Sequence, residues 1–280
     1  MDSSFTSRSL LLLITLFLIS SLAQGQDLIR DTTIIVENQP LHFRITLGEG
    51  NPILFEAGNG DDGSVWNSIL DSIHQQTNAT LITYDRVGLG KSKLTTDSIS
   101  FQDEVRYLEN ALDSLGIEGD LLLVAHSFGG FYSSLFAYNN ATRINGAVFI
   151  ETATPCFMTK EWSENYISGI SDQDWQMIKA YKIGLYYTLR NLPVITDYMA
   201  PRFLNSKVPL TLIVAENLPN ENTLRTSLDR VNYSNCLENY GHLPMHKYVL
   251  AKEADHHVWI KRPHLVIEEI TQLYQAVTKS

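Results

Sequence analysis

The sequence predicts an α/β fold built on a mostly parallel, doubly wound sheet. Short and nearly uninterrupted apolar runs recur along the chain, and segments with helical spacing lie between them. Continuous apolar runs are typical of parallel strands, because crossover helices cover both faces of such a sheet. The length of 280 residues suits one large domain with a single core.

The first elements form a hairpin, two strands and two helices. The runs 32–36 and 41–46 flank the turn sequence Asn-Gln-Pro at 38–40. Apolar runs at 52–57 (PILFEA) and 79–84 (ATLITY) have the length of buried strands. Apolar residues at helical spacing predict helices, which we place at 67–76 and 101–115.

The later elements continue the alternation. Buried strands are expected at 121–125 (LLLVA), 146–150 (GAVFI), 210–214 (LTLIV) and 247–251 (KYVLA). A helix is expected to follow the first of these runs. A last helix is expected to begin at a proline, which suits the first helical position. These two helices are placed at 128–138 and 263–276.

One long stretch interrupts the alternation of strands and helices. About 55 residues join the strands 146–150 and 210–214, far more than a usual connection. Tyr181, Leu185 and Leu189 are spaced as on one helical face. We expect a helical lid near 156–207, over the carboxyl edge of the sheet; helices that only extend the core are the alternative. The stretch is rich in aromatic residues, which are Phe157, Trp162, Tyr166, Trp175, Tyr181, Tyr186, Tyr187 and Tyr198.

The first 25 residues resemble a secretory signal peptide. Arg8 supplies a positive charge, Leu10 to Leu22 is an apolar run of 13 residues, and Ala23 and Gly25 suit a cut before residue 26. A membrane-spanning helix needs about 20 residues, so an uncleaved anchor is the lesser alternative. We therefore expect residues 26–280 to be exported to the periplasm or secreted, without a stable membrane span.

Composition limits the partners. The net charge is −10 and the isoelectric point is near 5.2, so the surface would repel phosphate groups, and nucleic acid is excluded as a partner. The only two cysteines, Cys156 and Cys236, pair in an oxidising compartment or stay as buried thiols; the sequence leaves both possibilities open.

The strongest local signal is the stretch 121–132, LLLVAHSFGGFY, which places Ser127 between a buried strand and a helix. A serine hydroxyl becomes a nucleophile when a base is held beside it. The sharp turn presents Ser127 above the sheet edge, and the small residues Ala125 and Gly129 let the chain pass closely. The N–H of Phe128 then points at a developing oxyanion. A serine that only caps the helix is the alternative.

This stretch resembles the elbow of the α/β-hydrolase superfamily, and the resemblance covers nearly all of the chain after the first 25 residues. The family elbow usually has glycine where this sequence has Ala125. The run 55–60, FEAGNG, stands where the family places its oxyanion loop, which implies the backbone N–H of Asn59 as the second oxyanion donor.

A further loop, 84–92 (YDRVGLGKS), looks like the family's D-R-x-G-x-G-x-S loop. We expect Asp85 and Arg86 to be structural, with their charges bracing this loop.

The resemblance also selects the base. In the family the catalytic histidine follows the last strand, seven residues before a proline that opens the last helix. That spacing selects His256, ahead of Pro263, and leaves His257 as the competing candidate. A histidine beside Ser127 takes the hydroxyl proton and returns it to the leaving group.

The acid has three candidates. The family usually places it in the loop after the strand 210–214, where this chain has Glu216 but no aspartate. Glu151, at the end of the preceding strand, is similar to the acid of those haloalkane dehalogenases that carry a glutamate there. Glu151 is the first choice, Glu216 the second and Glu221 the third; a carboxylate that only lines the pocket is the alternative reading of Glu151.

The dehalogenases and epoxide hydrolases of this fold use an aspartate nucleophile where this chain has Ser127. A serine forms an acyl-enzyme, so we expect a serine hydrolase of carboxylic esters, with a small substrate whose apolar group lies under the lid. A peptidase or C–C bond hydrolase is an alternative within catalysis. A non-catalytic ligand-binding protein on the same fold is the alternative outside it.

No cofactor or metal is expected from sequence spacing. The pairs Asp61-Asp62 and His256-His257 lack partners at ligand spacing. The run 58–60 lacks the third glycine of a dinucleotide-binding loop.

Overall fold

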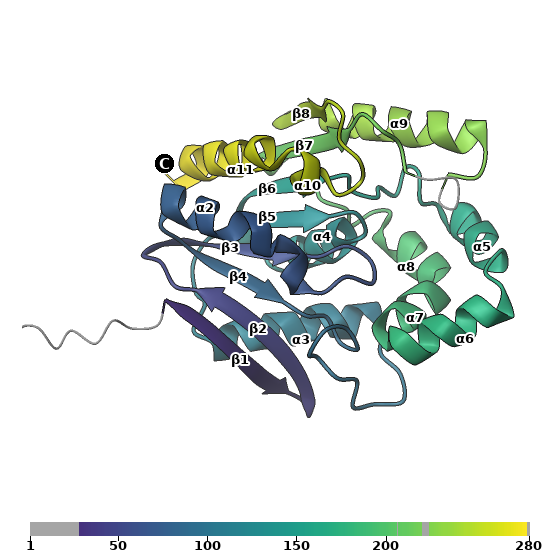
Figure 1. Cartoon of the computed structure of the whole chain (residues 1–280), viewed down its shortest axis with the longest axis horizontal. Helices are drawn as coiled ribbons and strands as arrows, with labels where there is room; N and C mark the ends of the chain where they lie inside the picture. The colour runs from purple at the N-terminus through teal and green to yellow at the C-terminus, as the bar shows by residue number, and fades with distance from the viewer. Residues whose placement is uncertain (1–27, 206, 220–223, 279–280) are drawn as a thin grey trace, which may run out of the picture.

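A computed structural model describes residues 28–205, 207–219 and 224–278 of the chain (Figure 1). The expected signal segment and the third acid candidate, Glu221, lie outside the described residues. Within the described ranges, no helix has both the length and the apolar character needed to span a bilayer.

Eight strands of the described chain form one sheet in the order β1-β2-β4-β3-β5-β6-β7-β8. The pairs β1·β2 and β2·β4 are antiparallel, and every other neighbouring pair is parallel. The predicted mostly parallel sheet is confirmed. The strands are β1 (Ile29–Val36), β2 (Gln39–Thr46), β3 (Gly50–Glu56), β4 (Ala79–Tyr84), β5 (Leu121–His126), β6 (Ile144–Ile150), β7 (Leu210–Ala215) and β8 (His246–Ala251).

Helices cover both faces of the sheet, as Figure 1 shows. Alternate residues of β5 belong to two separate cores: Leu121, Leu123 and Ala125 pack on one face, and Leu122 and Val124 on the other. The first face carries α3 (Phe101–Ser114), α4 (Gly129–Asn139) and α9 (Ser227–Gly241). The second carries α2 (Asn67–Thr77), α10 (Val258–Lys261) and α11 (Pro263–Thr278).

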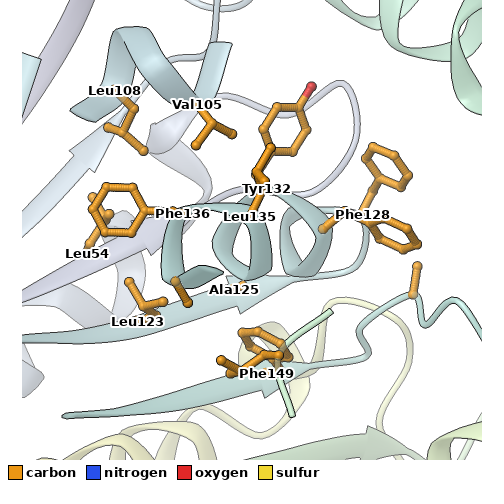
Figure 2. Packing of buried hydrophobic residues seen from close by; sticks show 14 of the residues in the cluster. Leu54, Val105, Leu108, Leu123, Ala125, Phe128, Tyr132, Leu135, Phe136 and Phe149 are labelled. Carbon is orange, nitrogen blue, oxygen red and sulfur yellow. The ribbon is translucent and has the colours of Figure 1, made fainter. Parts of the chain in front are cut away.

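The first core fixes the helix that follows Ser127. In Figure 2, α4 lies over the β5 face that carries Leu123 and Ala125, and Tyr132 is turned toward α3, where its ring centroid lies 4.6 Å from that of Phe101. Tyr132 and Phe136 are fully buried, and burial of a large side chain contributes about 2 to 3 kcal/mol each. The turn that carries Ser127 therefore sits between a buried strand and a firmly packed helix.

The sequence prediction differs from the structure at the turn of the opening hairpin and at one helix that it did not foresee. The hairpin turns at Glu37 and Asn38, which both have positive φ, and Pro40 lies inside β2 opposite Ile35. Helix α9 was not predicted from apolar spacing. Its start carries a capping box, in which Thr226 and Asp229 bond each other's backbone N–H, and that pattern is readable in the sequence.

Four helices occupy the long connection between β6 and β7: α5 (Lys160–Ser168), α6 (Asp172–Tyr181), α7 (Ile183–Arg190) and α8 (Leu192–Met199). We call them the four-helix insertion; Figure 1 shows them gathered at one end of the sheet. The expectation that Tyr181 shares a helical face with Leu185 and Leu189 is wrong. Helix α6 ends at Tyr181 and the chain turns at Lys182, which leaves Tyr181 86% exposed.

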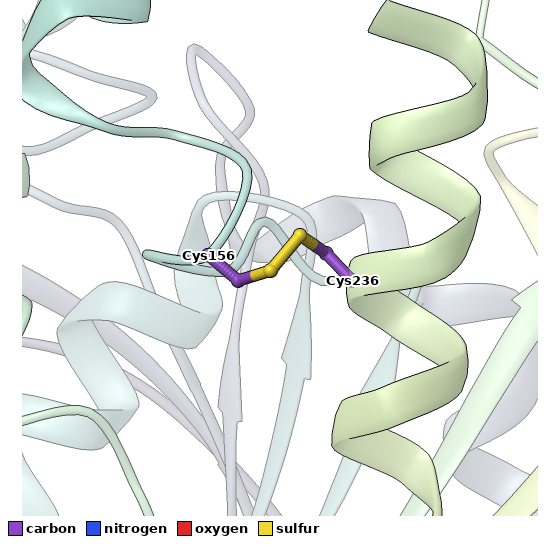
Figure 3. Close-up of a disulfide and its surroundings, with 2 residues drawn as sticks. All are labelled: Cys156 and Cys236. Atoms are coloured by element: carbon purple, nitrogen blue, oxygen red, sulfur yellow. A yellow bond between two sulfur atoms is a disulfide. The ribbon is translucent and has the colours of Figure 1, made fainter.

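Cys156 and Cys236 form a disulfide, with their Cα atoms 5.6 Å apart. Figure 3 shows that it joins the loop after β6 to α9. The bridge closes 80 residues of sequence. It therefore ties the start of the insertion to a helix of the sheet's first face.

Candidate active site

Ser127 lies in the turn between β5 and α4 and has φ of 52°. A non-glycine residue in the left-handed region costs about 1 to 3 kcal/mol and persists only where its surroundings enforce it. Here the Ser127 N–H donates to the Ile150 carbonyl at 3.0 Å, and its carbonyl accepts from the N–H of Gly130 and of Ala153 at 3.1 Å each. These bonds hold the hydroxyl-bearing residue in a strained turn at the sheet edge.

Glycines behind the turn make this close packing possible. A Cβ on Gly129 would lie 2.5 Å from the Ala57 carbonyl oxygen, and a Cβ on Gly130 would lie 1.9 Å from the Thr152 hydroxyl. The glycine pair therefore lets α4 start directly against the loops that follow β3 and β6.

A cavity of about 210 Å³ opens at this edge. Five residues selected from the sequence line it, from four separate loops: Asn59, Ser127, Phe128, Glu151 and His256. The structure thus brings together every first-choice catalytic residue and both oxyanion candidates.

Glu151 comes directly after β6, has φ of 47° and is 1% exposed. Its carboxylate accepts three contacts: the Ala215 N–H at 2.6 Å, the Tyr233 hydroxyl at 3.0 Å, and the Nδ1 of His256 at 3.4 Å. A buried carboxylate needs such partners, because desolvation penalises its charged form. Two neutral donors hold Glu151 in place, and its remaining contact is the imidazole.

His256 lies in the loop between β8 and α10 and is partly open to the cavity. With Nδ1 facing Glu151, the Nδ1–H tautomer leaves Nε2 as the basic nitrogen. No hydrogen bond joins Ser127 to His256, both of which are described residues. In ligand-free enzymes the bond between nucleophile and base is often longer than in the substrate complex.

The competing candidates lie elsewhere. His257 Nε2 lies 3.6 Å from Asp61 Oδ2, and His257 is absent from the cavity wall. Glu216 is exposed, and its carboxylate accepts from the Glu253 N–H at 2.9 Å. Of the described carboxylates, Glu151 is the one that contacts His256.

The residues of the two expected oxyanion donors, Asn59 and Phe128, line the same cavity as Ser127. The N–H groups of Asn59 and Phe128 have no protein acceptor in the described part of the chain. The side-chain oxygen of Asn59 is also buried without a partner among the described residues. These groups remain available to a polar atom in the cavity.

Arg86 fixes the loop that carries Asn59. Its guanidinium donates to the carbonyls of Ala57 at 2.7 Å and Gly58 at 2.5 Å, and it forms a buried ion pair with Glu56. Burial raises the pKa of Glu56, although the charge of Arg86 acts in the opposite direction. Arg86 is thus structural, as expected.

Asp85, the other charged residue of its loop, is structural too. Its carboxylate accepts from the N–H groups of Gly63 at 2.9 Å and Lys91 at 2.8 Å.

The rest of the cavity wall is mostly apolar. It comes from the loops after β6 and β7, from α5, α7 and α8, and from α9. Beyond the residues already placed, the wall contains Ala153, Phe157, Met158, Trp162, Tyr166, Leu189, Leu192, Pro219 and Tyr233. The four-helix insertion therefore forms one side of the cavity, and the sheet edge forms the other.

Sequence reasoning missed two features of this region. Tyr233 sits on the helix that apolar spacing did not reveal, so its bond to Glu151 was not foreseen. Asp61, His126 and His257 also lie together, with one ligand atom from each within 4.8 Å of the others. No sequence spacing signals this cluster, because its members come from the loop after β3, the end of β5 and the loop after β8.

Comparisons with known proteins agree with the fold. The family model described as alpha/beta hydrolase fold matches residues 51–175. The uncharacterized protein YqjL of Bacillus subtilis is 32% identical over 124 residues, which is 44% of this chain and 48% of that protein. A haloalkane dehalogenase of Sphingobium indicum is 26% identical over 139 residues, which is 48% of this chain and 44% of that protein. The matched segments thus span about half the length of these relatives.

Solved structures match over most of the chain. A thermophilic esterase from Thermogutta terrifontis has a TM-score of 0.62 at 17% identity, covering 89% of this chain and 99% of that one. The epoxide hydrolase VrEH1 from Vigna radiata has a TM-score of 0.64 at 18% identity, covering 89% and 99%. The chain has the α/β-hydrolase fold.

Proposed function

We propose that this protein is a serine hydrolase that cleaves small carboxylic esters through an acyl-enzyme. One observation carries the proposal: the strained Ser127 shares a cavity wall with His256, whose Nδ1 faces the buried Glu151. Nucleophile, base and orienting acid thus meet at one sheet edge.

The reaction follows from these positions. His256 Nε2 takes the Ser127 hydroxyl proton as Oγ attacks the ester carbonyl, and the N–H groups of Asn59 and Phe128 receive the oxyanion. The C–O bond to the alcohol breaks, and the imidazolium gives the alcohol its proton. Water then attacks the acyl-enzyme with the same base, which releases the acid and restores Ser127. Glu151 keeps the imidazole in the productive tautomer throughout.

The cavity supports a small, apolar acyl or alcohol group. Its volume of about 210 Å³ is below the usual range of about 300 to 1,000 Å³ for drug-sized ligands. Phe157, Trp162 and Leu192 are among its apolar walls. In this proposal the four-helix insertion acts as the lid that selects the substrate.

Turnover of p-nitrophenyl acetate and butyrate tests the proposal. We expect Ser127→Ala to lower kcat/KM on the order of 10⁴-fold or more. Ser134→Ala is the matched control, because Ser134 is a buried serine on α4 with no hydrogen-bond partner for its hydroxyl in the described chain. Wild-type rates in Ser127→Ala would overturn the proposal.

We also propose that residues 1–25 direct export, as the sequence predicts. The disulfide is compatible with an oxidising compartment. N-terminal sequencing of the protein recovered outside the cytoplasm tests this: a start at residue 26 supports it, and a start at Met1 contradicts it.

A further inference from the structure

A second polar cluster lies beside the catalytic residues, and the ester chemistry does not use it. Asp61 belongs to the loop that carries Asn59, His126 precedes Ser127, and His257 follows His256. One side-chain ligand atom from each lies within 4.8 Å of the others, and His257 Nε2 is 3.6 Å from Asp61 Oδ2. Two imidazoles and one carboxylate are a donor set that binds divalent transition metals.

The burial and hydrogen bonding of His126 are those expected of a metal ligand. It is 1% exposed, and its Nε2 lies 3.0 Å from the His256 carbonyl, which only accepts hydrogen bonds. Nε2 therefore carries the proton, and Nδ1 presents a lone pair. That buried Nδ1 has no hydrogen-bond partner among the described residues. Histidine ligands of metals typically donate their other N–H to such an acceptor.

Gly58 keeps the space between the ligands open. A Cβ at this position would lie 2.6 Å from His126 Nδ1 and 3.2 Å from Asp61 Oδ2. A side chain there would thus fill the place that an ion needs. Trp66 and Trp259 pack against the His126 ring with centroid distances of 6.5 Å and 4.7 Å, which limits its movement.

The charged groups near Asp61 bear on which cation the cluster would take. Lys182 and Arg86 act electrostatically on Asp61 and oppose a cation, so imidazole coordination has to supply much of the affinity. This favours Zn²⁺-like ions over Mg²⁺ or Ca²⁺, which prefer all-oxygen sites.

We propose that Asp61, His126 and His257 bind one divalent transition-metal ion of the Zn²⁺ class, with a fourth position open to water. Tetrahedral zinc with ligands at about 2.0 to 2.1 Å places ligand atoms roughly 3.3 Å apart, so the side chains need to close in by a small distance. The ion would join the three loops that carry Asn59, Ser127 and His256. It therefore stabilises the loops of the ester-cleaving site without entering the reaction.

Calorimetric titration of the full, untagged, metal-stripped chain with ZnCl₂ tests the proposal. We expect one site per chain, a melting temperature that rises with Zn²⁺ concentration, and no such effect from MgCl₂ or CaCl₂. Bound Co²⁺ should give the visible absorption of a four-coordinate site. Asp61→Asn and His257→Gln should each weaken Zn²⁺ binding at least about tenfold.

Two further variants complete the design. His264→Gln, at an exposed histidine outside the cluster, should bind Zn²⁺ as the wild type does. Gly58→Ala should abolish binding, since its Cβ would occupy the space. The proposal is overturned if Asp61→Asn and His257→Gln, shown to be folded by circular dichroism, bind as tightly as the wild type. It is equally overturned if the wild type gives only weak, multi-site binding. Zn²⁺ binding without ester hydrolysis would contradict the proposed function alone.

Discussion

The carboxyl edge of the sheet and the four-helix insertion form opposite walls of one cavity, but they are built differently. At the sheet edge, Ser127 and Glu151 both have left-handed backbone, and backbone and side-chain hydrogen bonds hold each of them. In the insertion, α7 and α8 pack into the core, but α6 buries no residue and α5 buries only Ser163. The edge thus fixes the geometry of reacting groups, whereas the outer helices α5 and α6 supply a mostly exposed surface. We therefore expect changes at the edge to affect kcat and changes in the insertion to affect KM.

After the loss of Ser127 itself, the largest effect is expected at the acid. Glu151→Gln keeps the size of the side chain but removes its charge, which disfavours the productive tautomer and the imidazolium of His256. We expect kcat to fall on the order of 10³- to 10⁴-fold. Glu216→Gln, at the exposed glutamate of the usual family position, should stay within twofold of the wild type. The ratio of ester turnover in the two variants measures this, and equal losses would contradict the assignment.

The next largest predicted effect is a loss of stability on removal of the disulfide between Cys156 and Cys236. Replacing both Cys156 and Cys236 by serine removes a link that spans 80 residues, which lowers the free energy of unfolding by about 4.5 kcal/mol in the chain-entropy model. Urea denaturation of wild type and variant, each with and without dithiothreitol, measures the loss. Dithiothreitol should destabilise only the wild type. An unchanged midpoint in the double variant would show that the bridge adds no stability.

A third predicted effect is a pH dependence of stability that arises from Glu104, a buried residue of α3. Burial raises the pKa of Glu104 to about 7 because it outweighs the opposing charge of Arg86. The nearby carboxylates of Glu56 and Asp103 add to the rise. Its carboxyl group contacts the Tyr132 hydroxyl at 2.6 Å. Below its unfolded pKa of 4.5 the group is protonated in both states, so its contribution to stability is fully present there.

Between about pH 4.5 and 7 the unfolded chain loses this proton first, so the free energy of unfolding falls as pH rises, by up to roughly 3 kcal/mol. We expect Glu104→Gln to remove this decrease in the free energy of unfolding, because glutamine does not titrate. Subtracting its denaturation profile from that of the wild type isolates the contribution of Glu104. A difference that does not change across this window would contradict the raised pKa.

The smallest effect is expected in the insertion. Trp162 lines the cavity and stacks on Tyr166 at 5.1 Å, whereas Trp175 lies on α6 away from it. Trp162→Ala should raise KM for butyrate esters about tenfold and leave kcat within about threefold. Trp175→Ala, the matched control, should change neither constant appreciably. A large fall in kcat with unchanged KM in Trp162→Ala would mean that the insertion takes part in the chemistry.

The same contrast explains what sequence could predict. Parallel strands are buried on both faces, so 79–84 was located to the residue, and 121–125 and 146–150 to within two residues. Ser127 was selected because it directly follows the buried strand 121–125, and His256 was selected because its spacing to Pro263 resembles the family pattern. The insertion packs through partly exposed helices, so Tyr181 and Leu185 gave a false helical face across the break at Lys182.

Contacts between segments that are distant in the sequence could not be predicted either. The bond from Tyr233 to Glu151 joins residues 82 apart in the sequence, and the approach of His257 to Asp61 joins the loops that follow β8 and β3. No local pattern encodes such distances. The choice of Glu151 over Glu216 likewise rested on resemblance, and the contact with His256 gave it a physical basis.

Labelling with a fluorophosphonate tests the central claim most directly, since the probe reacts only with an activated serine. We predict one adduct per folded chain, located by peptide mass spectrometry at Ser127 and lost in His256→Ala. The absence of an adduct on folded protein, or an adduct at another serine, would contradict it.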